Sequence, residues 1–318
     1  MQPKKSLGQH FLTSQKAIAE IIKAGDLNPN DVILEIGPGT GVLTEKLLAS
    51  GAQIIAIEKD GELVNLLKEK FAKEIKDEKL ILLHQDILDF NPETDLVFPA
   101  RSGSASSGKK NISNNKIKIN NILKYKIIAN IPYYLTGMIF TKFLETKFKP
   151  DMMVLLVQKE IADRIVAKNK KESILSLAVK FYTNQNPKLI YKVSAGSFFP
   201  KPKVDSAVLQ IKIKNPENSV DNVDNKDEKI KREIEKKYLE IIKIAFAHKR
   251  KMMLSNLKTG FNKNLQEKII NEKEKLKDNL KIPDWDKIFS ELNLNKKVRA
   301  EDLQKENFLK IAEKIVLQ

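Results

Sequence analysis

The feature that most constrains the fold is a series of seven short, apolar, β-rich runs along the first two thirds of the chain. They lie at residues 32–36, 53–57, 80–83, 126–129, 152–157, 189–193 and 207–213. The stretches between most of them space their apolar residues at helical intervals, at residues 43–48, 63–71, 138–144 and 161–182. This alternation predicts an α/β fold built on a parallel, doubly wound sheet of seven strands.

Two features break the alternation toward the C-terminus. No helical stretch separates the last two runs, which are joined through FPKPK at residues 199–203, and this stiff connection predicts a final antiparallel hairpin. Helical periodicity then returns at residues 230–257, 265–276, 285–292 and 308–317. We therefore expect an α/β domain at residues 1–213, a linker at 214–229 and a smaller, all-helical domain at 230–318.

Two polar segments, 101–121 and 215–229, contain few apolar residues. Segments of this composition bury too little apolar area to offset the conformational entropy lost on ordering. We expect the first to be a mobile insertion within the α/β domain. The second marks the predicted boundary between the two domains.

The charge balance narrows the choice of partner. Lysine and arginine number 57 against 41 aspartate and glutamate, so the formal net charge is +16, which favours nucleic acid or an anionic membrane face. Cysteine is absent, which excludes disulfides, thiolate metal sites and a cysteine nucleophile. The N-terminal residues do not resemble a signal peptide, and the longest apolar run, 152–157, is too short to span a membrane. We expect a cytoplasmic protein.

A glycine-rich turn, EIGPGTG at residues 35–41, directly follows the first apolar run and precedes a helical stretch. Its three glycines, Gly37, Gly39 and Gly41, allow the backbone to approach a ligand closely. Glu58 ends the next run, where a carboxylate can accept both hydroxyls of a ribose. The pattern favours an adenosine-type cofactor. A dinucleotide cofactor fits the sequence less well, because valine stands at position 42 where the dinucleotide-binding pattern has glycine. The other alternative is a turn with a purely structural role.

Further acceptor groups follow the third and fourth runs. Asp86 lies at the predicted carboxyl edge of the sheet, where it can accept from an adenine amino group. The tetrapeptide NIPY ends the fourth run, and Pro132 holds Ile131 extended while supplying no N–H. Asn130 adds a side-chain acceptor and Tyr133 a flat ring. Such a site suits an exocyclic amine whose ring is stacked; a plain strand-to-turn transition with a core tyrosine is the alternative.

These motifs make the sequence similar to the KsgA/RsmA-type small-subunit rRNA adenine-N6,N6-dimethyltransferases, whose wider family includes the Erm 23S rRNA methyltransferases. The resemblance runs in the same order over about 250 residues. It is carried by KSLGQHFL at 5–12, the glycine turn, Glu58, Asp86, NIPY, FFPKPKVDS at 198–206 and AFAHKRK at 245–251.

The resemblance implies a Rossmann-like methyltransferase sheet that uses S-adenosylmethionine, releases S-adenosylhomocysteine and needs no metal. It implies cofactor contacts from His10, Leu12, Gly37, Gly39, Gly41, Glu58, Asp86 and Asn130. It assigns the chemistry to Asn130, Ile131, Pro132 and Tyr133. Tyr133 and Phe199 would hold the target adenine between them. The implied reaction is dimethylation of N6 on two adjacent adenosines near the 3′ end of 16S rRNA.

The basic run at residues 248–251 is predicted to lie on a helix, with Lys249 and Arg250 facing the 16S rRNA of the small ribosomal subunit. A solvated helix face is the structural alternative. We expect a monomer that does not bind membranes. An Erm-type enzyme and a non-catalytic RNA-binding assembly factor are the competing functions, and a nucleotide-dependent oxidoreductase is a distant third.

Overall fold

The computed structural model describes residues 3–4, 7–97, 117–118, 124–214, 226–271 and 282–317. Its internal contacts divide the chain into two compact units: Met1–Val166 with Tyr182–Asn215, and Ala167–Phe181 with Pro216–Gln318. The predicted insertion at 101–121 lies outside the described residues except for 117–118. Most of the predicted linker, from 215 to 225, also lies outside them.

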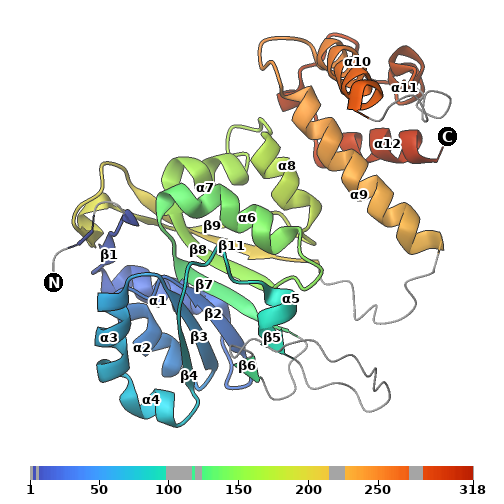
Figure 1. Ribbon diagram of the computed structural model, residues 1–318. Coiled ribbons are helices and arrows are strands. Elements are labelled where there is room, and N and C mark those ends of the chain that lie inside the picture. The colour runs from blue at the N-terminus through green and yellow to red at the C-terminus, as the bar shows by residue number, and fades with distance from the viewer. Residues whose placement is uncertain are drawn as a thin grey trace, which may run out of the picture. The chain divides into compact units, whose positions relative to one another are not determined.

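The first unit contains a seven-stranded sheet with the order β4-β3-β2-β7-β8-β11-β9 (Figure 1). Its strands are β2 (Val32–Ile36), β3 (Gln53–Glu58), β4 (Leu80–His84), β7 (Lys126–Asn130), β8 (Met152–Gln158), β9 (Lys188–Val193) and β11 (Ser206–Lys212). The strands from β4 to β8 pair in parallel, whereas β11 pairs antiparallel with both β8 and β9. All seven predicted strands and the predicted antiparallel pairing of the last two are confirmed.

Short elements complete the strands of the first unit. Two-residue strands pair as β1 (Phe11–Leu12) with β10 (Phe198–Phe199), and as β5 (Leu96–Val97) with β6 (Ile117–Lys118). The first of these pairs matters for the site, because it joins the N-terminal segment to a segment nearly two hundred residues later. Phe11 lies opposite Phe199 in this ladder.

Helices connect the strands and cover the sheet (Figure 1). In the first unit they are α1 (Gln15–Gly25), α2 (Val42–Leu48), α3 (Gly61–Lys70), α4 (Ala72–Lys76), α5 (Pro92–Asp95), α6 (Thr136–Leu144) and α7 (Lys159–Ile165), with 3₁₀ turns η2 (Tyr133–Leu135) and η3 (Ala195–Ser197). Strand β8 is apolar except for its last residue and strand β2 is apolar except for Glu35, and both are buried along nearly their whole length. Such runs are expected where helices cover both faces of a parallel sheet.

The chain order places a ligand crevice at one edge of this sheet. From β2 the chain moves outward to β3 and β4, then crosses back to β7 on the other side of β2 and continues to β8. The order therefore reverses between β2 and β7. In open α/β sheets, ligands bind outside the carboxyl ends of the strands at such a reversal.

One predicted helical stretch, residues 161–182, is wrong as a single element. It consists of α7 and α8 (Ile174–Phe181), and the contacts assign α8 to the second unit. Ala167 and Lys170 adopt positive φ values of 51° and 59° after α7, which ends the helix. Ser173 then accepts the N–H of Ser176 through its hydroxyl and begins the next helix.

The described part of the second unit is helical, as predicted. It contains α8, α9 (Lys226–Ala245), α10 (Met253–Asn271), α11 (Trp285–Glu291), η4 (Ala300–Asp302) and α12 (Lys305–Val316). Their apolar faces form one core that includes Tyr238, Phe289 and Phe308, which are fully buried. The predicted helix at 265–276 is the second part of α10, and its last residues, 272–276, lie outside the described ones.

The predicted helix at residues 230–257 is also wrong as one element, because the chain leaves the helical path between α9 and α10. The side-chain amide of Asn256 explains the break. Its Nδ2 donates to the carbonyls of Ala245, at 2.7 Å, and of His248, at 3.1 Å. The first bond satisfies a carbonyl that the end of α9 leaves without a helical partner, and the second binds the turn at His248, whose carbonyl also accepts the N–H of Lys251. The basic run at 248–251 therefore lies on a loop rather than on a helix.

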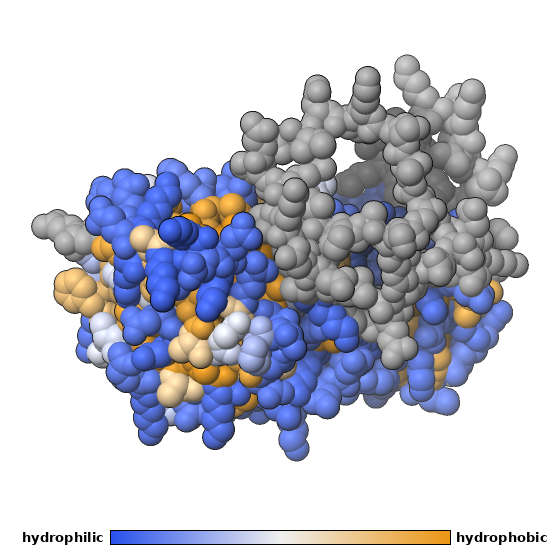
Figure 2. All heavy atoms as spheres, turned by 90° about the horizontal axis from the view of Figure 1, so that it is seen from below, coloured by the Kyte–Doolittle hydropathy of each residue, from blue (hydrophilic) through white to orange (hydrophobic). Residues whose placement is uncertain are grey.

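Figure 2 shows mostly hydrophilic residues where the described surface is visible from that side, with smaller apolar areas between them. Among the described helices, none is long and apolar enough to cross a membrane.

Candidate active site

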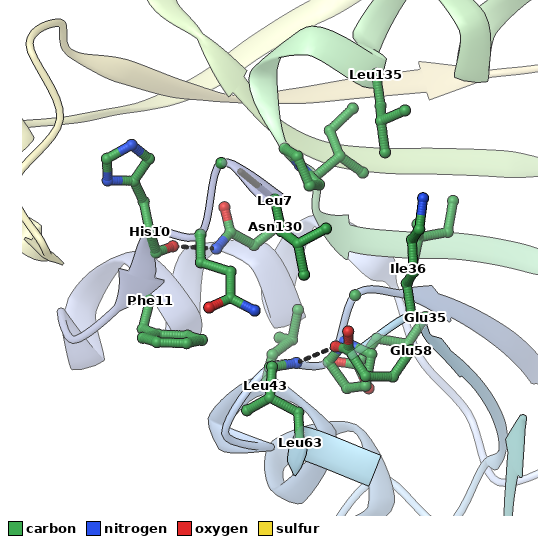
Figure 3. Close-up of a pocket in the computed structure, with 18 of the residues that line it drawn as sticks. Leu7, His10, Phe11, Glu35, Ile36, Leu43, Glu58, Leu63, Asn130 and Leu135 are labelled. Carbon is green, nitrogen blue, oxygen red and sulfur yellow. Dashed lines mark hydrogen bonds between the residues drawn. The ribbon is translucent and has the colours of Figure 1, made fainter. Parts of the chain in front are cut away.

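A cavity lies at the carboxyl ends of β2, β3, β4 and β7, where the strand order reverses. It contains about 1110 Å³ of empty volume, including space open to solvent. The N-terminal segment at residues 7–12 forms part of its wall, as Figure 3 shows for Leu7, His10 and Phe11. The sheet and this segment thus enclose the cavity together.

The glycine turn between β2 and α2 is built from three residues with positive φ: 64° at Gly37, 60° at Gly39 and 77° at Gly41. A Cβ at Gly39 would lie 3.1 Å from the ring of Phe11, and one at Gly41 would lie 2.6 Å from the ring of Phe71. Gly37 and Gly39 line the cavity, whereas Gly41 does not. Gly41 is instead the N-cap of α2, and its lack of a side chain leaves room for the ring of Phe71.

Glu35, which the sequence did not predict as a site residue, contributes a buried carboxylate to the cavity wall. It is 1% exposed, and its Oε2 has no hydrogen-bond partner within the described residues. Burial raises the pKa of Glu35 to about 8; the Thr44 hydroxyl opposes this increase, and the neighbouring Glu58 carboxylate adds a smaller one. The available signal was an acidic residue inside a buried strand.

Glu58 ends β3 and lies beside the glycine turn (Figure 3). One carboxylate oxygen accepts the N–H of Gly39 at 3.2 Å, and the other accepts the N–H of Asp60 at 2.9 Å. Burial raises the pKa of Glu58, while these bonds oppose the increase. Each oxygen keeps a second lone pair, so a fixed carboxylate can still accept ligand hydroxyls.

Asp86 follows β4 and also lines the cavity. Its Oδ1 accepts the N–H of Leu88 at 2.9 Å, and its Oδ2 pairs with Lys59 Nζ at 2.7 Å. Burial favours the neutral acid, but these two contacts outweigh it and lower the pKa of Asp86. An ionised acceptor is therefore held at the end of β4, and Lys59 is a partner that the sequence had not indicated.

Asn130 ends β7, and its amide orientation follows from its partner. Its Nδ2 donates to the backbone carbonyl of His10 at 3.1 Å, shown by a dashed line in Figure 3. A carbonyl can only accept, so the amide N–H₂ must face His10 and the amide oxygen must face away from it. The N-terminal segment thus sets the direction of the acceptor on Asn130.

Tyr133 lines the cavity together with Ile131 and Pro132. Its hydroxyl hydrogen-bonds Ser206 Oγ at 2.7 Å, and burial raises its pKa. The His10 ring stacks on Tyr133 with centroids 5.9 Å apart and hydrogen-bonds the Pro200 carbonyl through Nδ1 at 2.7 Å. The imidazole is therefore held by Pro200 and Tyr133, and His10 lines the cavity.

Of the two remaining predicted site residues in the first unit, Leu12 and Phe199, one lines the cavity and the other does not. Leu12 lines the cavity, on the strand β1 that pairs with β10. Phe199 on β10 does not line it, although its neighbour Phe198 does. The Phe199 side chain is 62% exposed, so an apolar ring is presented to solvent next to the segment that carries His10.

Lys249 and Arg250 lie in the second unit, on the exposed loop between α9 and α10. A second basic loop lies beside it, because the N–H of Met253 donates to the carbonyl of Val298 at 3.0 Å. Lys297 and Arg299 are exposed on this second loop. The fold thus joins two basic segments that lie about fifty residues apart in the sequence, a juxtaposition that the sequence alone did not reveal.

The sheet, with its reversed β11 between β8 and β9, and the acidic residues at the ends of β3 and β4 define a Rossmann-like methyltransferase. The sequence matches the family described as ribosomal RNA adenine dimethylase over residues 1–297. The chain belongs to this family and is an rRNA adenine dimethyltransferase.

Similar proteins support this membership. Ribosomal RNA small subunit methyltransferase A of Dehalococcoides mccartyi is 38% identical over 261 residues, covering 82% of this chain and 76% of the relative. The protein of the same name from Nostoc is 32% identical and covers 98% and 97%.

Two solved structures share the fold. A dimethyladenosine transferase from Plasmodium falciparum has a TM-score of 0.66 at 23% identity, covering 95% of this chain and 96% of that one. The 23S rRNA methyltransferase ErmE has a TM-score of 0.61 at 18% identity, covering 95% and 98%.

Proposed function

We propose that this protein transfers methyl groups from S-adenosylmethionine to N6 of two adjacent adenosines near the 3′ end of 16S rRNA. The observation that carries the proposal is the fixed amide of Asn130: the residue lines the cavity where the strand order reverses, and its amide oxygen faces away from the His10 carbonyl that holds its N–H₂. The relatives named small subunit methyltransferase A favour the small-subunit RNA as substrate.

The cavity fits S-adenosylmethionine, which supplies an electrophilic methyl group when bound. The unpartnered Oε2 of Glu35 would accept from the cationic amino group of the methionine part, whose charge favours the ionised carboxylate over the neutral acid of the ligand-free protein. Glu58 would accept the ribose hydroxyls, and Asp86 the adenine amino group. A Cβ at Gly37 would meet no atom within 4 Å, so this position leaves open space for a ligand. His10, Leu12 and Gly39 complete the wall; Gly41 supports it from outside the cavity.

The chain's own residues would prepare N6 for reaction. The nitrogen of an adenine amino group is a weak nucleophile because its lone pair is delocalised into the ring. If the Asn130 oxygen and the Ile131 carbonyl accept its hydrogens, the nitrogen becomes pyramidal and its lone pair is directed along one line. Positioning of this kind lowers the barrier without a general base. The proton leaves to solvent, and a second transfer follows while one N–H remains.

The target base would be held outside its stack by aromatic faces. Tyr133 is fixed by Ser206, so its ring needs no reordering when a base arrives. Phe199 presents an exposed ring on the segment paired with β1. Stacking on each ring is worth about 1–3 kcal/mol. Pro132 keeps the backbone before Tyr133 extended.

Lys249 and Arg250, with Lys297 and Arg299 beside them, would bind RNA phosphates on the second unit. Loops suit this task because their side chains can reach a curved backbone from several directions. We further propose that the protein acts in the cytoplasm, on the small-subunit RNA, as a monomer. Light scattering after gel filtration tests the oligomeric state.

The decisive experiment is methylation with labelled S-adenosylmethionine, followed by mapping of the modified adenines. Purified small ribosomal subunits and 23S rRNA are offered separately. We expect two dimethylated adenosines close to the 3′ end of 16S rRNA. Modification of 23S rRNA alone would instead assign an Erm-type activity, which the structural similarity to ErmE keeps as the second candidate. RNA binding without methylation of either RNA would indicate a non-catalytic assembly factor.

A further inference from the structure

The N-terminal segment closes one side of the cavity and is held at several points. Residues 7–12 line the cavity. At the end of this segment, β1 pairs with β10, and the His10 side chain hydrogen-bonds the Pro200 carbonyl. Lys4, which precedes this segment, and Gln9, which lies within it, both bind one residue, Asp60, just after the end of β3.

Asp60 is buried and uses both carboxylate oxygens. Its Oδ1 accepts Lys4 Nζ at 2.7 Å and also the N–H of Glu62 at 3.1 Å, which caps α3. Its Oδ2 accepts Gln9 Nε2 at 2.9 Å. Its own N–H donates to Glu58 at 2.9 Å. Asp60 therefore connects the N-terminal segment directly to the carboxylate beside the glycine turn.

The orientation of Gln9 is determined by its neighbours. Its Oε1 accepts the backbone N–H of Lys4 at 2.7 Å, so its Nε2 must be the group that faces Asp60. The residue after Gln9 is His10, whose backbone carbonyl accepts a hydrogen bond from Asn130 Nδ2. A short path thus runs from Asp60 through Gln9 and the His10 carbonyl to the acceptor on Asn130.

We propose that Asp60 is a positioning residue that fastens the N-terminal segment over the methyl-donor site and thereby orients Asn130. The inference rests on the proposed function, since it names S-adenosylmethionine as the molecule enclosed. A residue that only capped α3 would need one carboxylate oxygen and no contact with Lys4 or Gln9. The bond from Gln9 to the second carboxylate oxygen is not needed for a helix cap, and it is this bond that holds the N-terminal segment.

Asp60→Asn separates the two roles. Its oxygen can keep the helix cap and a hydrogen bond to Lys4, now to a neutral amide, whereas its N–H₂ would face the N–H₂ of Gln9, so the Gln9 link is the hydrogen bond that is lost. We expect the Kd for S-adenosylmethionine to rise about tenfold, equal to about 1.4 kcal/mol. kcat should fall as well because Asn130 is less well oriented, while KM for RNA changes less than about twofold. Backbone hydrogen exchange of residues 7–12 should become faster.

Two further variants make the test specific. Gln9→Ala should reproduce the Asp60→Asn phenotype, and the double variant should be no worse than either single one, because both remove the same link. Glu62→Gln is the matched control: Glu62 also pairs with Lys4, at 2.9 Å, but has no bond to Gln9. It should leave donor affinity and hydrogen exchange as in the wild type.

Several results would overturn the proposal. Asp60→Asn with wild-type donor affinity and unchanged exchange at residues 7–12 would do so. Additive effects of Asp60→Asn and Gln9→Ala would show that they act separately. Asp60→Ser keeps a cap but cannot reach Gln9, and full donor affinity in that variant would reduce Asp60 to a helix cap. If Asp60→Asn shows faster hydrogen exchange at residues 7–12 and weaker S-adenosylmethionine binding, the role of Asp60 is supported even when no rRNA is methylated. Failure of the proposed function can therefore be told apart from failure of this inference.

Discussion

Glu35→Gln tests the most unusual group in the cavity, a fully buried carboxyl with one unpartnered oxygen. In the folded protein without ligand, burial raises the pKa of Glu35 from 4.5 to about 8. The unfolded chain exposes this group to water, so its pKa there is the ordinary one. The variant removes the titration and keeps nearly the same shape.

The sign of the effect follows from linkage. Below pH 4.5 the carboxyl is protonated in both states, and Glu35 does not penalise folding. Between pH 4.5 and about 8 the unfolded state ionises while the folded state stays neutral, so stability falls by up to about 1.4 kcal/mol per pH unit. Above pH 8 the accumulated penalty is about 5 kcal/mol.

Urea unfolding of wild type and variant without ligand, at intervals from about pH 5.5 to pH 8, measures this penalty. The free energy of unfolding of Glu35→Gln relative to wild type should increase by about 3 kcal/mol across the range. The substitution also changes the free energy of unfolding by an amount that does not depend on pH. This amount cancels, because only the change with pH is compared. Glu69→Gln, an exposed position on α3, is the control for the same chemical change. A pH-independent difference for Glu35→Gln would refute a buried neutral acid.

Three further outcomes are expected. Glu58→Gln should weaken S-adenosylmethionine binding about tenfold or more by calorimetric titration, because charge-assisted hydrogen bonds contribute about 1.5–3 kcal/mol; unchanged affinity would remove Glu58 from the site. Asn130→Ala should lower single-turnover methylation about 10²-fold with little change in RNA affinity, and full turnover would contradict its role. Lys249→Ala combined with Arg250→Ala should weaken RNA binding and flatten its salt dependence by about 0.7–0.9 per lost phosphate contact, measured by filter binding, while turnover at saturating RNA survives.

The strands were predictable because their signal is local. An unbroken apolar run such as β8 is buried on both faces wherever it lies in a parallel sheet, so its type follows from its own residues. The two wrong helices fail for a different reason. The break before α8 depends on left-handed backbone at Ala167 and Lys170, and the break after α9 depends on an amide from α10. Periodicity continues across both breaks and does not reveal them.

The site divides in the same way. The places of Gly37, Glu58, Asp86 and Asn130 on the cavity wall were predictable because each ends a strand or follows one within two residues, and parallel strands bring such residues to one edge. The orphaned oxygen of Glu35 was not, since it depends on everything packed around β2. Neither was the exclusion of Gly41 and Phe199 from the cavity wall.

The sequence by itself determined the seven strands, the glycine turn and the residue types at the strand ends, because backbone sterics and hydrophobic periodicity act over a few residues. Only the tertiary structure decided how those groups are directed. The His10 carbonyl orients an amide 120 residues away, and Asp60 joins Gln9 from 51 residues away. Hydrogen bonds of this kind leave no pattern in the chain, since their geometry exists only once the sheet has brought both partners together.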